Sequence, residues 1–319
     1  MRAHTHSSRP RGLLAIAAAL GAIAAGAACS SDFVKQSQIE QLRVLGVQAD
    51  PAELILDGGT LPKTTFTALA VEPSGAPITT QFAVCLIDTA SGLPPANLDC
   101  PGDAGYTLPD AGAYGATLDL ADPKLQAAAL PFFTADGGPS NVDGGLQAAL
   151  AQGVPLVVGF LALAPPGGNP DGGPPATTGY ATQRLQGIAT ITLRTRDDKN
   201  PLNHNPALHA ISLDGVAIAA DGSTTVKVNH VAKLEPVPES DAKEETPDAG
   251  LEKLTYSFFA TAGDLDALRT TDTTATGQAA DTSNQWTAPA TPQTVQLWIV
   301  VRDGRNGTGW ITRSVTVVP

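Results

Sequence analysis

The sequence predicts an all-β protein built from two tandem β-sandwiches. Short runs enriched in β-branched residues alternate with turns that are rich in Gly and Pro. Aromatic residues make up only 5% of the chain, which contains 32 Gly and 26 Pro, and this composition favours many short strands over a helical bundle. The second half of the chain also repeats the plan of the first, which predicts two related units.

The first 28 residues are predicted to be an export signal and not part of the fold. Arg2, Arg9 and Arg11 make residues 1–12 positively charged, and residues 13–28 are uncharged and apolar. This apolar run is too short for a membrane-spanning helix of about 20 residues. It leads through small residues into a cysteine, which is the layout of a cleaved secretory signal.

The end of this signal, Gly26-Ala27-Ala28-Cys29, resembles the lipobox of bacterial lipoproteins. In that family the cysteine is acylated and becomes the new N-terminus, and Leu usually stands where this chain has Gly26. The resemblance implies lipidation at Cys29, with residues 29–40 as a short tether. The alternative is ordinary cleavage at the A-x-A-like site Ala25-Gly26-Ala27.

The cysteine count favours lipidation. The chain has three cysteines, Cys29, Cys85 and Cys100, although an exported protein is expected to have an even number of thiols. If Cys29 carries lipid, Cys85 and Cys100 remain as one pair, and we predict a disulfide between them. Closing that loop would stabilise the fold by roughly 3 kcal/mol. A metal site is disfavoured because no further thiolate or histidine lies nearby in the sequence.

The charge of the mature chain argues against nucleic acid as a partner. All 31 acidic residues follow Cys29, whereas three of the 19 basic residues are lost with the signal, which leaves a net charge of −15. Phosphate backbones and anionic head groups should repel such a chain. The longest remaining apolar run, residues 154–164, suits a buried strand better than a membrane span.

The first unit is predicted to span residues 41–196. Its strands are expected at 42–50, 64–73, 79–88, 154–165 and 183–195. Residues 91–153 are rich in Gly, Pro, Ala and Asp, with short helix candidates at about 123–130 and 144–152. We interpret this range as a long insertion that expands the middle of the sandwich.

The second unit is predicted to span residues 201–319, after a polar, proline-bracketed boundary at 196–206. Its strands are expected within 207–215, 224–236, 254–263, 294–304 and 309–318. The acidic run from Glu235 to Glu252 is predicted to be solvated. Two units of this size with about seven strands each fit immunoglobulin-like sandwiches.

A resemblance supports this fold for residues 204–319. A Tyr-containing strand (254–263) precedes a W-x-A-P turn at Trp286, and a later strand ends in Arg302-Asp303-Gly304 before a Gly-rich hairpin. These features resemble bacterial Ig-like and PKD-like surface modules, and the layout is similar to Ig-like lipoproteins of high-GC Gram-negative bacteria. The resemblance implies a scaffold, spacer or adhesive surface and brings no catalytic or ligand-binding residues.

No recognisable catalytic or metal motif accompanies the strands. The mature histidines are His204, His209 and His230. The first two are five residues apart, so they form neither an i,i+4 pair on a helix nor an HxH pair on one face of a strand. We expect solvated or edge-strand histidines, no metal and no cofactor. GxSxG, Walker-type, GxGxxG and HExxH motifs are absent from the sequence, although a dispersed serine triad stays open.

Aspartate-glycine loops and tryptophans offer two weaker hypotheses. Asp136, Asp143 and Asp171 each precede Gly-Gly and could bind calcium weakly, but the alternating Asp spacing of calcium loops is missing, so turns are favoured. Trp286, Trp298 and Trp310 recur every 12 residues and could line a carbohydrate-binding face. Core or cross-strand packing is the favoured interpretation. Asn306-Gly307 indicates a hairpin loop.

The sequence therefore predicts a lipid-anchored cell-envelope protein with a structural, adhesive or protein-interaction role and no catalysis. Ser30 resembles the residue after the cysteine in lipoproteins sorted to the outer membrane of Gram-negative bacteria. The expected partners are the membrane, through the lipid, and protein or polysaccharide at the envelope. The alternatives are a glycan- or small-ligand-binding module and a hydrolase whose site lies in residues 91–153, where the mature chain has no histidine.

Overall fold

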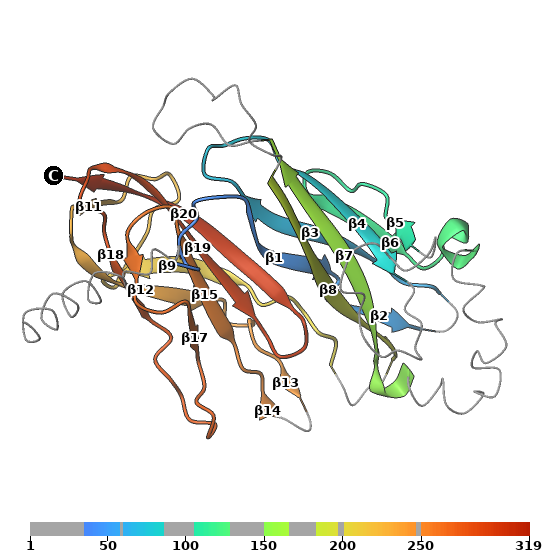
Figure 1. Cartoon of the computed structure of the whole chain (residues 1–319). Coiled ribbons are helices and arrows are strands. Elements are labelled where there is room, and N and C mark those ends of the chain that lie inside the picture. Colours follow the sequence, from blue (N-terminus) through green and yellow to red (C-terminus); the bar gives the residue numbers. More distant parts are fainter. Residues whose placement is uncertain are drawn as a thin grey trace, which may run out of the picture. The chain divides into compact units, whose positions relative to one another are not determined.

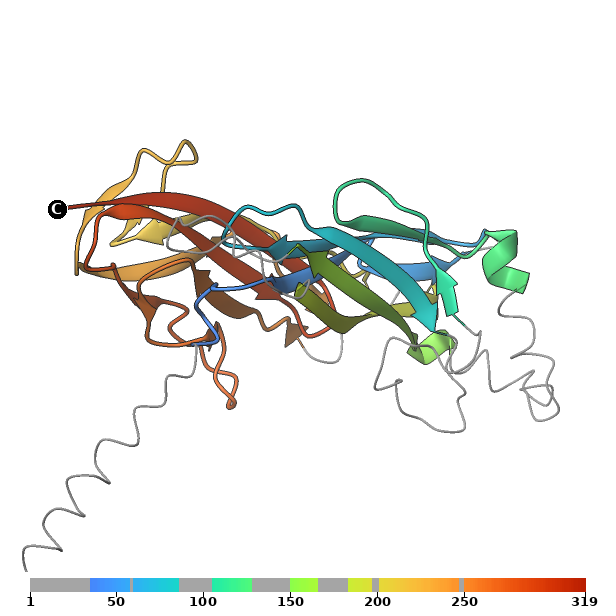
Figure 2. The same cartoon turned by 45° about the horizontal axis from the view of Figure 1, so that its top comes forward.

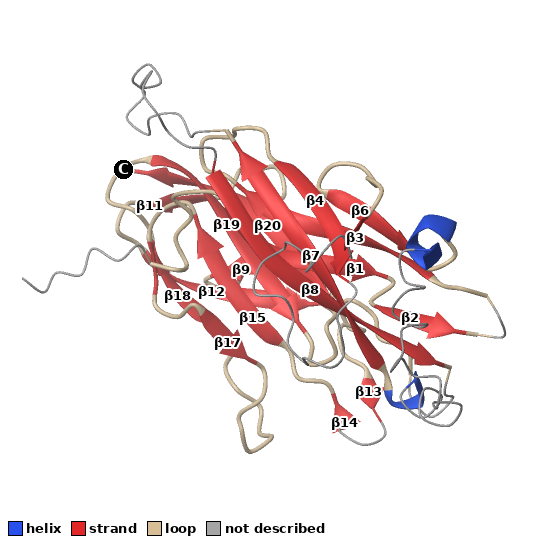
Figure 3. Ribbon diagram, turned by 45° about the vertical axis from the view of Figure 1, so that its right-hand side comes forward, coloured by secondary structure: helices blue, strands red, loops and turns tan. Residues whose placement is uncertain are grey.

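The computed structural model describes residues 35–57, 60–85, 105–127, 150–165, 183–196, 201–246 and 250–319. Residues Gln36–Pro319 form one compact unit, and nearly all of its regular structure is β-strand (Figure 3). Residues 123–127 and 150–152 are helical, at both predicted positions. Within the described ranges, no helix has the length and apolar character needed to cross a bilayer.

The first sandwich consists of a three-stranded and a five-stranded sheet (Figure 1). The three-stranded sheet has the order β1 (Arg43–Asp50), β3 (Lys63–Val71) and β6 (Gly115–Asp119). The five-stranded sheet has the order β2 (Glu53–Leu56), β8 (Gln183–Thr195), β7 (Val154–Ala164), β4 (Thr79–Cys85) and β5 (Gly105–Thr107). Between them, Phe66, Phe82 and Phe160 are buried, with ring centroids 6.0 and 6.3 Å apart in successive pairs.

The second sandwich consists of two five-stranded sheets. One has the order β10 (Val216–Ala217), β9 (Leu208–Leu213), β12 (Val231–Pro238), β18 (Asn284–Thr287) and β16 (Asp264–Leu265). The other has the order β11 (Thr225–Lys227), β20 (Thr308–Val318), β19 (Gln293–Arg302), β15 (Thr255–Ala260) and β17 (Arg269–Thr271). The long β19–β20 hairpin is red in Figure 2, and β13 (Glu245–Thr246) and β14 (Gly250–Leu251) form a separate small hairpin. Trp286, Tyr256 and Phe258 fill the core.

Both sandwiches follow the same plan. In each, the chain enters one sheet, as β1 or β9, and then crosses to the other sheet, where β2 or β11 pairs in parallel with the last strand, β8 or β20. The remaining strands pair antiparallel, and the closing hairpins are β7–β8 and β19–β20. This order is that of immunoglobulin-like sandwiches, so the predicted all-β, immunoglobulin-like fold class is confirmed, whereas the number of tandem domains stays a prediction.

The predicted insertion at 91–153 is not one continuous excursion from the sandwich. Its residues 105–107 and 115–119 form β5 and β6, and these strands join opposite sheets of the first sandwich. The sequence Gly-Ala-Thr-Leu-Asp of β6 is too short to show a clear alternation, although Ala116 and Leu118 are buried. Residues 86–104 and 128–149 of this region lie outside the described ranges.

Each sandwich has its own core, but the two are not separate compact units. One buried cluster draws on residues between Ala49 and Ile191, and the other on residues between Ile211 and Val317. A third cluster joins β1 to β19, and all of these residues belong to the compact unit Gln36–Pro319. The division into domains at 41–196 and 201–319 therefore stays a prediction.

Candidate functional site

The two sandwiches meet at a contact surface that we call the seam, and its first part is an apolar cluster in and just before β1. Leu45 and Ile39 are buried against Trp298 and Val300, which project from the face of β19 opposite the core residues Leu297, Ile299 and Val301. At Gly46 an added Cβ would lie 3.3 Å from side-chain atoms of Thr308 and Val300, so β1 approaches this face closely. The outer face of β19 is thus packed against the first sandwich.

The linker between the sandwiches forms the second part of the seam. Asn205 Nδ2 donates to the carbonyl oxygen of Ala49 at 2.7 Å, and Asn205 Oδ1 accepts from the Thr308 amide at 3.0 Å. One side chain therefore ties β1 to β20. Asn203, two residues earlier, is only 2% exposed. A polar segment predicted to be a boundary is in fact held by both sandwiches.

Two glycines of the β19–β20 hairpin give this linker room. A Cβ at Gly309 would lie 1.9 Å from the carbonyl oxygen of Pro206, and one at Gly307 would lie 2.8 Å from that of His204. Asn306, with φ of 80°, precedes Gly307 in the loop, as the sequence predicted for a hairpin. The Gly-rich end of the hairpin has a role beyond turning the chain, because the linker crosses directly over it.

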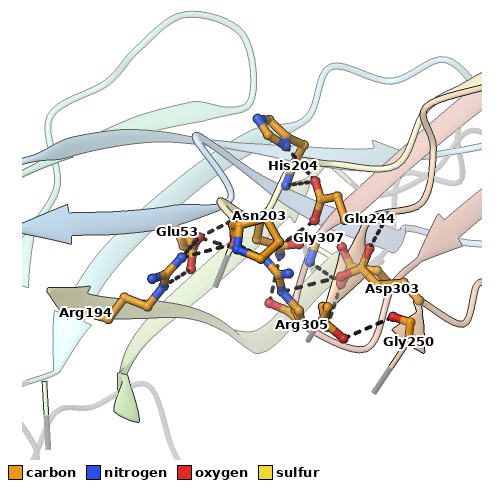
Figure 4. A network of polar contacts seen from close by, with 12 residues as sticks. Glu53, Arg194, Asn203, His204, Glu244, Gly250, Asp303, Arg305 and Gly307 are labelled. Carbon is orange, nitrogen blue, oxygen red and sulfur yellow. Dashed lines mark hydrogen bonds and ion pairs between the residues drawn. The ribbon is translucent and has the colours of Figure 1, made fainter. Parts of the chain in front are cut away.

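A buried ion pair anchors the polar side of the seam (Figure 4). Arg194 donates to both carboxylate oxygens of Glu53 at 2.8 Å, and the Asn203 amide donates to Glu53 Oε1 at 2.6 Å. Burial alone would raise the pKa of Glu53, but the hydrogen bonds from Arg194 and Asn203 and the charges of Arg194 and Arg305 leave that pKa lowered. Glu53 is therefore held as a carboxylate.

Arg305 lies among further carboxylates at the centre of the network (Figure 4). Its guanidinium nitrogens lie 3.4 Å from Glu252, 3.5 Å from Glu244 and 3.8 Å from Glu53. Its backbone carbonyl oxygen accepts from Asn203 Nδ2 at 3.0 Å, which connects the hairpin to the linker. The arginine thus shares its charge among acids from both sandwiches.

Two acids of this network lie where burial disfavours the ionised form. Burial is the main reason that the pKa of Glu252 is raised, and the charges of Asp303 and Glu244 add to the effect. Burial also raises the pKa of Asp303, whose Oδ1 accepts from the amides of Arg305 and Gly307 while Oδ2 has no hydrogen-bond partner among the described residues. The prediction that the acidic run is solvated to its end is wrong for Glu252, which is buried beneath Arg305.

This network is suited to holding the sandwiches together. In the described part of the chain, no group of three His, Cys, Asp or Glu side chains could hold a metal ion. His204 Nδ1 contacts Glu244 at 2.6 Å, His209 contacts Glu239 at 3.2 Å, and His230 contacts Asp214 at 2.8 Å. Each histidine has its own carboxylate, so the three do not converge.

Most of the other sequence-predicted site residues lie outside the described ranges. These are Cys29, Cys100, Asp136, Asp143 and Asp171. Cys85 is the last residue of β4. Lipidation of Cys29, the Cys85–Cys100 disulfide and calcium binding at the aspartate loops therefore remain predictions.

The tryptophans do not form an exposed ligand face. Trp286 lies in β18, with no exposed surface, and its Nε1 donates to the Ala262 carbonyl oxygen at 3.1 Å. Trp298 is 8% exposed within the seam, and Trp310 packs half-buried against the same cluster. Core and seam packing accounts for all three, and the carbohydrate-binding hypothesis loses the feature on which it depended.

The seam leaves a groove of about 580 Å³ over the outer face of β15, β17 and β19. We call it the arginine groove because Arg43, Arg269 and Arg302 line it, together with Gln36, Thr255, Ser257 and four other residues. The sequence offers no local signal for this groove, since the three arginines come from β1, β17 and β19. A second, smaller groove of about 380 Å³ lies on β1 and shares Arg302.

No family model and no curated protein matches this chain. Similar solved structures include a nucleoside hydrolase-related hypothetical protein from Saccharophagus degradans, at 12% identity and a TM-score of 0.23. The match covers 36% of this chain and only 26% of the other protein. Two others are the D00-D0 domain of intimin and the Ig1-2 module of the Drosophila receptor protein tyrosine phosphatase DLAR. Each is 10% identical with a TM-score of 0.24, over 88% of this chain and 99% or 100% of the other. These low scores relate the chain to none of the three, and the fold assignment rests on its strand order.

Proposed function

We propose that this protein is an exported, lipid-anchored envelope protein whose two Ig-like sandwiches act as one rigid interaction unit without catalysis. The observation that carries this proposal is the seam. The contacts of Glu53 with Asn203 and Arg305, the bridging Asn205 side chain and the Leu45–Trp298 cluster join the sandwiches. A linker free of such contacts would instead allow the relative motion that is usual between domains.

A rigid pair suits a protein that holds a recognition surface at a fixed position on a membrane. The lipid on Cys29 would supply the attachment, and the sandwich pair would project from it. Glu53 contributes to this role because it contacts Asn203 of the linker and Arg305 of the second sandwich. Moving the second sandwich away would take these partners from a buried carboxylate, which disfavours alternative arrangements.

The anchor is tested by metabolic labelling. We would express the full precursor in a Gram-negative host with an alkyne-tagged fatty acid and compare the wild type with Cys29→Ser. Label is expected only in the wild type, together with its recovery in the outer-membrane fraction. Equal label in both proteins would refute the anchor.

Rigidity is tested separately on the non-acylated Cys29→Ser chain. Backbone ¹⁵N relaxation should give one rotational correlation time for amides of β7–β8 and of β19–β20, because the seam makes them tumble together. Two clearly different correlation times would refute the rigid unit, whatever the labelling experiment shows.

A further inference from the structure

We propose that the arginine groove binds a phosphate group, and that this phosphate belongs to the head group of a membrane lipid. The groove carries three guanidinium groups in a mature chain whose net charge is −15. Binding of a phosphate goes beyond the proposed function. Only the choice of a lipid as its source rests on the anchor at Cys29.

Strand register places the groove's polar side chains on one face. Arg269 of β17 lies opposite Ser257 of β15, and Arg302 of β19 lies opposite Thr255 of β15. Residues directly opposite on paired strands point to the same face of a sheet. Arg302 Nη1 also donates to Ser257 Oγ at 3.3 Å, which fixes the guanidinium in the groove, and Arg43 reaches it from β1.

The three arginines have no carboxylate partner in the described part of the chain. Arg43 donates to the Gln36 carbonyl oxygen at 2.5 Å, Arg302 donates to that of Leu45 at 2.6 Å, and Arg269 makes no side-chain hydrogen bond or ion pair there. By contrast, Arg194, Arg196 and Arg305 each lie within 4.0 Å of a carboxylate.

The groove therefore has an excess of positive charge. Three arginines line it, and Asp303 is the one acidic residue among its lining residues. Burial, and then the positive charge of Arg269, lowers the pKa of Arg302. The two guanidinium groups therefore repel each other. A bound anion would remove this repulsion.

A phosphate fits this arrangement better than a single carboxylate or a peptide. Guanidinium groups form paired hydrogen bonds with phosphate oxygens, and three of them can surround a group that carries up to two negative charges. The volume of about 580 Å³ lies in the range of small-ligand sites. The groove runs over the face of a sheet, so a peptide could not extend that sheet by backbone pairing there.

Chain length favours a lipid as the source of the phosphate. Gln36 lines the groove and lies seven residues after Cys29. Seven fully extended residues reach at most about 25 Å, so a lipid on Cys29 would keep the groove within that distance of the bilayer. Local arginines would then offset the repulsion between an acidic chain and anionic head groups.

The test uses the non-acylated chain from residue 29 with Cys29→Ser, so that the anchor contributes nothing. Cosedimentation at low salt would compare phosphatidylcholine vesicles that contain phosphatidic acid, oleate or no anionic lipid. We expect binding to the phosphatidic acid vesicles only, weakening as salt is added. Arg269→Gln should reduce the partition coefficient onto the phosphatidic acid vesicles about tenfold, which corresponds to the loss of one charge-assisted hydrogen bond. Arg269 is exposed and makes no side-chain hydrogen bond or ion pair with the described residues.

The matched control is Arg196→Gln, which removes an exposed positive charge outside the groove. Its binding should stay close to that of the parent chain. Equal binding by the Arg269 and Arg196 variants would overturn the groove as the site, and equal binding of oleate vesicles would overturn the phosphate. Calorimetric titration with inorganic phosphate distinguishes a lipid head group from free phosphate as the ligand. If the chain binds inorganic phosphate but does not bind phosphatidic acid vesicles, the lipid head group is overturned as the ligand. None of these outcomes depends on whether Cys29 is acylated.

Discussion

Substitution of Gly309 by alanine is expected to open the seam. The added Cβ would lie 1.9 Å from the Pro206 carbonyl oxygen, whereas unstrained contacts between carbon and a carbonyl oxygen are about 3.3 Å or longer. The linker must therefore move by about 1.4 Å. Because Pro206 follows Asn205, this shift breaks the hydrogen bonds of Asn205 with Ala49 and Thr308.

The cost of this substitution can be worked out from these contacts. Two hydrogen bonds contribute about 2 kcal/mol together, and steric overlap in a packed region adds about 1–3 kcal/mol. The more restricted unfolded chain returns up to about 1 kcal/mol, so the free energy of unfolding should fall by about 2–5 kcal/mol.

Guanidinium denaturation, followed by tryptophan fluorescence at pH 7, measures this free energy. Gly304→Ala is the matched control, because it lies in the same hairpin loop with no atom within 4 Å of its added Cβ. The control should change stability by less than about 0.5 kcal/mol. If Gly309→Ala proves as stable as Gly304→Ala, the linker does not pack closely over the hairpin, and this contact between the sandwiches is refuted.

Three further substitutions probe the cores and the network. Gly187→Ala places its Cβ 2.3 Å from the ring of Phe160 and should cost about 1–3 kcal/mol in denaturant unfolding; combining it with Phe160→Leu should recover part of that loss, and additive effects would contradict the contact. Trp286→Phe leaves the Ala262 carbonyl oxygen without its donor and should lower the free energy of unfolding by about 2–4 kcal/mol. An unchanged denaturation midpoint would contradict the hydrogen bond between Trp286 and Ala262. For Asp303, the folded-state pKa is raised above the ordinary value of 3.8, so its stabilising contribution is complete below that pH and is lost as pH rises through the folded-state pKa. Asp303→Asn should therefore raise the unfolding midpoint at pH 7 by a margin that shrinks toward pH 4, and a margin independent of pH would refute this reasoning.

The seam explains why a polar linker can be rigid. A free linker would leave Asn203 and Asn205 hydrated, but here their amides bond to groups from both sandwiches. Removing one of these side chains would leave the facing buried group unsatisfied, which costs more than the net value of the bond. The sandwiches are thus held by polar groups that have few alternative partners.

Local patterns in the sequence were sufficient for the long strands and for the repeated plan. The apolar run of β7 and the alternation along β20 report burial directly, because successive side chains of a strand point to opposite faces. The order in which such strands follow each other is the same in both halves, so the repeat could be recognised without a structure. The β5 and β6 strands were missed because they are three and five residues long, and so short a segment shows no period.

Only the tertiary structure decided which faces meet. Gln48 donates to the carbonyl oxygen of Thr308 across 260 positions of sequence, and Arg302 to that of Leu45 across 257. Nothing in the pattern around Leu45 distinguishes a residue that faces the neighbouring sandwich from one that faces its own core. The seam and the arginine groove arise from such distant contacts, and their residues become neighbours only when both sandwiches have folded. The sequence by itself determined the kind of units this chain makes, and the packing of one unit on the other determined where a site could form.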